Sequence, residues 1–91
     1  MPPDTILIGK KPVMAYVTAV MMHFQSGSNE LTVKARGQAI SRAVDVVEVV
    51  SRRFMTDKLN IKDISIGTEL LGEGDDVRNV STIEIKIQKT E

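Results

Sequence analysis

The chain has 91 residues and no net charge, because 12 Lys and Arg residues balance 12 Asp and Glu residues. This length predicts one domain, 1–91, with a modest core. The absence of cysteine excludes disulfides, thiol catalysis and cysteine-based zinc sites. No apolar run reaches the ~20 residues of a membrane span, and the first residues lack a signal-peptide pattern, so we expect a cytoplasmic location.

The charges are distributed unevenly along the chain. Residues 1–58 hold eight Lys and Arg against five Asp and Glu, a balance of +3, whereas residues 59–91 hold four against seven, a balance of −3. This asymmetry predicts one basic face on an otherwise acidic protein. The only aromatic residues are Tyr16, Phe24 and Phe54. A platform that stacks the bases of single-stranded nucleic acid is therefore not expected.

The first predicted unit is a strand followed by a helix. Residues 5–8 form a short apolar run that is typical of a buried strand. Pro12 suits the first position of a helix, which is predicted to run to about Gln25. Lys10 and Lys11 lie in the loop between them, beside a helix N-terminus whose free N–H groups attract phosphates. The alternative is that the lysine pair is ordinary solvated surface.

The second unit repeats this arrangement. Apolar and polar residues alternate over 30–36, which predicts a strand with one buried face, and a helix is predicted from about Gly37 to Met55. Three cations surround the junction between them: Lys34, Arg36 and Arg42. Because the two junctions follow successive strands of one sheet, we expect them to open on the same edge.

The second helix carries two apolar stripes. The first is assigned to the core and contains Ile40, Ala43, Val44, Val47 and Phe54. The second combines two valines with two arginines, namely Arg42, Val46, Val49 and Arg53. Such a mixture is not typical of a solvated face. The helix is therefore either buried on several sides by its own domain or in contact with a partner subunit.

The remainder of the chain predicts a hairpin. Residues 59–71 form a third strand, in which the apolar positions change phase between Ile61 and Ile64, so a bulge is expected near Lys62 and Asp63. A polar connection leads to a fourth strand at 80–89. The order βαβαββ predicts an α+β fold, a two-layer sandwich in which a four-stranded mixed sheet carries both helices on one face.

The groups that catalysis requires do not converge in this sequence. His23 is the single histidine and is interpreted as structural. The acidic cluster of Glu73, Asp75 and Asp76 lacks the ligand spacing of an EF-hand and is interpreted as a solvated hairpin. We therefore predict no enzyme activity, no metal and no cofactor, and favour binding over catalysis.

Four segments resemble the Alba family of archaeal chromatin proteins. They are IGKKPVM at 8–14, KARG at 34–37, AISRAVD at 39–45 and VSTIEI at 80–85. The resemblance covers almost the whole chain and implies the βαβαββ fold, which is similar to the C-terminal domain of bacterial translation initiation factor three. It also implies a homodimer that binds double-stranded DNA and RNA without marked sequence preference, coating or bridging duplexes on the chromosome of the nucleoid.

The resemblance assigns roles to particular residues. Lys10 and Lys11 would contact phosphates, and acetylation of one of them, by an acetyltransferase opposed by a deacetylase, would weaken binding. The last hairpin would be an arm that follows the minor groove. The other assignments are a nucleic-acid surface formed by Lys34, Arg36, Arg42 and Arg78, and Phe54 as an aromatic used in packing between dimers.

The chain departs from the family pattern at two places. Gln38 stands where many members carry a basic residue, and the tip of the hairpin is acidic, with Arg78 as its only cation. Both departures predict fewer phosphate contacts and a shallower salt dependence. Two alternative functions follow: a protein that mainly binds and stabilises RNA, and a protein–protein interaction module that uses the acidic hairpin.

Overall fold

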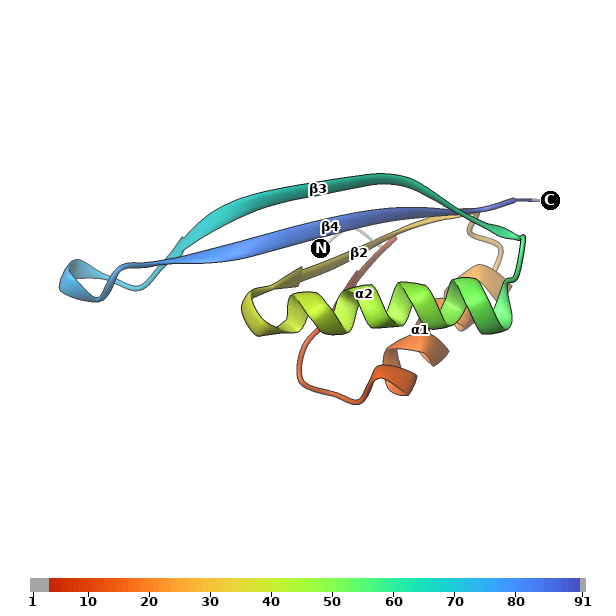
Figure 1. Ribbon diagram of the computed structural model, residues 1–91, viewed down its shortest axis with the longest axis horizontal. Helices are drawn as coiled ribbons and strands as arrows, with labels where there is room; N and C mark the ends of the chain where they lie inside the picture. The colour runs from red at the N-terminus through yellow and green to blue at the C-terminus, as the bar shows by residue number, and fades with distance from the viewer. Residues whose placement is uncertain (1–3, 91) are drawn as a thin grey trace.

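The computed structural model describes residues 4–90. A four-stranded mixed sheet carries two helices on one face, in the order βαβαββ, which confirms the predicted α+β class (Figure 1). β1 runs parallel to β2, and β4 lies between β2 and β3 and pairs antiparallel with both. The elements are β1 (Thr5–Leu7), α1 (Val13–Gln25), β2 (Glu30–Arg36), α2 (Ile40–Val49), β3 (Leu59–Leu71) and β4 (Arg78–Lys89).

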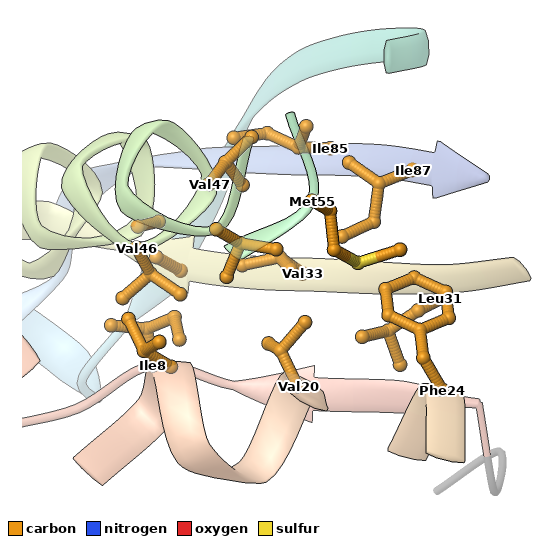
Figure 2. Close-up of a cluster of buried hydrophobic side chains, with 14 residues drawn as sticks. Ile8, Val20, Phe24, Leu31, Val33, Val46, Val47, Met55, Ile85 and Ile87 are labelled. Carbon is orange, nitrogen blue, oxygen red and sulfur yellow. The ribbon is translucent and has the colours of Figure 1, made fainter. Parts of the chain in front are cut away.

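The core lies between the helices and the inner face of the sheet. Successive side chains of a strand point to opposite faces, so Leu31, Val33 and Ala35 of β2 are buried together while Thr32 and Lys34 point the other way. Figure 2 shows apolar side chains of both helices meeting those of β2 and β4. Each fully buried Val or Leu side chain stabilises the fold by about 1.5–3 kcal/mol.

The second helix begins later than predicted. A 3₁₀ turn (Gly37–Ala39) separates β2 from α2, which starts at Ile40. Gly37 has a φ of 58°, a left-handed conformation that ends the strand and that glycine adopts without strain. α2 then ends at Val49 and passes into a π-helical turn (Val50–Phe54). The fourth strand also starts earlier than predicted, at Arg78.

The predicted stripes of α2 are partly wrong. Val46 was assigned to a partner contact, yet it is fully buried in the chain's own core, where Figure 2 shows it pointing from α2 towards Ile8. Conversely, Val44 and Phe54 were assigned to the core and are exposed. The physical reason is that α2 packs against both α1 and β2, so the buried arc of the helix covers Val46 and turns Val44 outwards.

The predicted bulge is present in β3. The register with β4 shifts between Ile61 and Asp63, so Ile61 and Ile64 oppose inward-facing isoleucines of β4 despite their different phases. They share this face with Ile66. Their side chains are 48%, 55% and 83% exposed, because both helices lie over the β1–β2 side of the sheet (Figure 1).

The last two strands extend beyond the rest of the molecule. The row Arg36–Thr82–Gly67 is the end of the three-stranded part, and residues 68–81 continue as a two-stranded ribbon, here called the arm. In Figure 1 the arm projects past both helices, and the molecule measures 50 × 22 × 19 Å. Residues 4–90 contain no helix that is long and apolar enough to cross a membrane.

Candidate nucleic-acid interface

The loop between β1 and α1, residues 9–12, is here called the lysine loop and is held from two sides. The Tyr16 hydroxyl of α1 accepts hydrogen bonds from the backbone N–H groups of Gly9 (2.8 Å) and Lys11 (3.1 Å). From α2, the Arg42 guanidinium donates a hydrogen bond to the Gly9 carbonyl at 2.6 Å. Side chains thus satisfy three backbone polar groups of a short loop, which orders it.

The charges of this loop are available to a ligand. Lys10 and Lys11 are exposed, and neither forms a salt bridge within residues 4–90. The first turn of α1 contains no acidic residue, and Pro12 before it provides no side-chain cap. The positive end of the helix therefore lies beside two lysines, an arrangement that favours phosphate or another anion.

The cations of β2 are presented differently. They lie on the face of the sheet opposite the helices, here called the open face. Arg36 donates a hydrogen bond to Glu69 at 3.1 Å, and the Lys34 ammonium lies 3.8 Å from a carboxylate oxygen of Glu84. These four side chains line a hollow of about 440 Å³. Both predicted phosphate contacts of β2 therefore already have anionic partners.

The two predicted junctions do meet, as expected from adjacent parallel strands. Arg42 links them, because it comes from the helix after β2 and binds the backbone after β1. Its guanidinium is partly buried, so part of its role is to support the lysine loop. Arg78 lies elsewhere. It opens β4 at the outer end of the arm, opposite Leu71, and is exposed.

The predicted assembly residues lie on the helical side of the molecule. Phe54 is 49% exposed and follows α2 in the π-helical turn, with the exposed Arg53 before it. It borders a hollow of about 300 Å³ that is also lined by Met14 and Met22 of α1. Val49 is partly buried against the core. These residues form no part of the open face.

Several residues contribute to the interface without having been predicted. Tyr16 was noted only as an aromatic residue, and its role depends on a helix that turns its hydroxyl back to the preceding loop. Glu69 pairs with Arg36 across 33 positions of sequence, so no local pattern indicates it. His23 contacts Asp4 at 3.1 Å, which ties the start of β1 to α1. In residues 4–90 no group of three or more His, Cys, Asp or Glu side chains is placed to hold a metal ion.

Comparison with known proteins decides the family. The Alba family model matches residues 4–68. The chain belongs to the Alba family. It is 50% identical over 86 residues to DNA/RNA-binding protein Alba 1 of Archaeoglobus fulgidus, a match that covers 94% of this chain and 96% of that protein. It is 51% identical, with the same coverage, to DNA/RNA-binding protein Alba of Methanothrix thermoacetophila.

Solved Alba structures share the fold. Alba from Thermoplasma volcanium superposes with a TM-score of 0.87 at 41% identity, covering 93% of this chain and 99% of that one. The match includes the hairpin strands that follow the family-model region, because coverage extends well beyond residue 68. The arm is therefore part of the shared Alba architecture.

Proposed function

We propose that this Alba-family chain binds double-stranded DNA, and also RNA, without sequence preference and in association with the chromosome. The observation that carries the proposal is the lysine loop, in which two unpaired lysines stand at a helix N-terminus on a backbone held by Tyr16 and Arg42. Lysine contacts to phosphates carry no sequence information, so such a surface positions a duplex without reading it. The relatives named as DNA/RNA-binding proteins support the same ligand class.

The test is the salt dependence of binding to a duplex. For B-DNA, log K falls by about 0.9 per neutralised phosphate for each log unit of salt. Lys10→Ala combined with Lys11→Ala should therefore flatten the slope by roughly 2 to 4 units, the upper value applying to a dimer that uses both loops. The variant should remain folded, since neither side chain belongs to the core.

The control removes the same charge at the other end of the sheet. Lys58 and Lys89 are exposed near the start of β3 and the end of β4, so changing both to Ala should leave the slope nearly unchanged. Parallel titrations with DNA and RNA duplexes of matched sequence measure the preference between the two ligands. An unchanged slope in the Lys10/Lys11 variant would contradict the proposal.

We further propose that the binding unit is a homodimer formed through β3. Ile61, Ile64 and Ile66 are exposed side by side on the helix side of the sheet, beyond the reach of either helix. Contiguous apolar surface of this kind marks an association site, and a symmetric pair of chains would cover it. This stripe takes the place of the buried Val46 in the interface.

Sedimentation tests the dimer. The wild-type protein should sediment as a dimer at micromolar concentration, and Ile64→Glu with Ile66→Glu should give a folded monomer, because unpaired charges in an apolar contact are costly. Met22→Glu charges an equally exposed apolar site on α1 and should leave the dimer intact. Val46→Ala should instead lower the free energy of unfolding by about 2 kcal/mol. A wild-type monomer would overturn the dimer.

Two further elements of the proposal concern regulation and assembly. Acetylation of Lys10 or Lys11 would remove charge from the lysine loop and weaken binding, so an acetyltransferase and a deacetylase are proposed partners. The exposed Phe54, beside the methionine-lined hollow, is proposed to pack between dimers bound to the same duplex, since large aromatics are frequent association anchors.

A further inference from the structure

The open face of the sheet contains a contact that the proposed phosphate surface does not explain. Arg36 is the last residue of β2, and Glu69 is the second residue of the arm on β3, with β4 between them. Their side chains cross β4 and meet at 3.1 Å. Gly67 and Thr82 lie in the same row as Arg36, and the missing side chain of Gly67 leaves the crossing open.

This contact occupies the group that a phosphate would need. A guanidinium binds carboxylates and phosphates through the same planar fork of N–H donors. While Glu69 accepts from Arg36, the pair has no net charge, so it attracts few counterions and releases few when a duplex arrives. A phosphate that reaches Arg36 must also approach the displaced carboxylate, which repels it.

We propose that Glu69 is an affinity-determining residue that competes with nucleic-acid phosphates for Arg36. This inference rests on the proposed function and names the regulation of the same surface. The lysine loop then provides the first contacts, and Arg36 contributes only when a phosphate displaces Glu69. Glu84 acts in the same sense on Lys34, but more weakly, because its oxygen lies 3.8 Å from the ammonium.

Glu69→Gln isolates the charge from the contact. An amide oxygen at this position still accepts a hydrogen bond from Arg36, so the join between β2 and the arm is kept while the competing charge is removed. With a labelled DNA duplex, the salt slope should steepen by about 0.9 per chain that gains a phosphate contact. The affinity at about 0.1 M salt should then rise by up to roughly eightfold.

Two variants separate competition from a general charge effect. Arg36→Ala removes the group for which Glu69 competes, so adding Glu69→Gln in that background should bring no further gain. Glu73→Gln removes the same charge beyond the end of β3, from a side chain with no salt bridge in residues 4–90, and should tighten binding less. Circular dichroism of each variant checks that the fold is retained.

The outcomes are distinct. An equal gain from Glu69→Gln with and without Arg36, a gain no larger than that from Glu73→Gln, or no gain at all would each overturn the competition. If the lysine-loop variant loses binding in the same assay, the proposed function still stands in those cases. A wild-type protein that binds neither DNA nor RNA duplex would overturn both proposals.

Discussion

The lysine loop and the open face of the sheet each carry two cations, but they present them in opposite ways. In the lysine loop, Tyr16 and Arg42 bind the backbone, and the charges of Lys10 and Lys11 have no anionic partner in residues 4–90. On the open face the backbone already belongs to the sheet, and Arg36 and Lys34 pair with carboxylates from neighbouring strands.

The difference shows that the count of cations on a surface does not measure its attraction for phosphate. An exposed ion pair contributes little to stability, commonly less than about 1 kcal/mol, yet it reduces the charge that a ligand meets. The lysine loop should therefore provide most of the salt dependence of binding. The three changes below test the support of the loop first and the acidic side of the comparison last.

Arg42→Ala should have the largest effect. It removes the guanidinium that donates to the Gly9 carbonyl and leaves that carbonyl without its charged partner, which should cost roughly 1.5–3 kcal/mol of unfolding free energy. Duplex affinity should fall as well, since the lysine loop is less ordered. Arg42→Lys keeps the charge but not the fork and should recover only part of both losses. Thermal unfolding and duplex titration measure the two effects, and full recovery by Lys would show that charge alone is needed.

Tyr16→Phe should have a smaller effect of the same kind. The ring is kept, while the N–H groups of Gly9 and Lys11 lose their acceptor, at a cost of roughly 1–2 kcal/mol for partly exposed groups. Amide hydrogen exchange at Gly9 and Lys11 should accelerate, and exchange at the buried Val20 in the middle of α1 should change only with global stability. Unchanged exchange at both loop amides would mean that Tyr16 does not order the loop.

The smallest effect is expected at the tip of the arm. Glu73→Gln, Asp75→Asn and Asp76→Asn together remove three negative charges from exposed positions that make no salt bridge in the described chain. Duplex binding should tighten slightly at low salt and become indistinguishable from wild type at higher salt, because screening acts strongly on exposed charges. Weaker binding by this variant would indicate that the acidic tip itself contacts a partner.

The order and type of the elements follow from the sequence alone. Alternation over Glu30–Arg36, helical periodicity over Val13–Gln25 and the phase change between Ile61 and Ile64 are local patterns, and each is confirmed in the structure. The cations of the lysine loop could also be named, because a strand, a short basic loop and a helix-starting proline are contiguous. Local periodicity reports which residues of one element share a face.

Periodicity does not report how many neighbours that element has. Val46 and Val44 exchange their expected environments because α2 packs against α1 as well as the sheet, and only the assembled layers determine which arc of a helix is buried. The pairing of Arg36 with Glu69 likewise depends on the placement of β4 between β2 and β3. The sequence by itself determined the elements and the free lysines. The tertiary structure alone decided which cations are neutralised, since ion pairs form between side chains that only the sheet topology brings together.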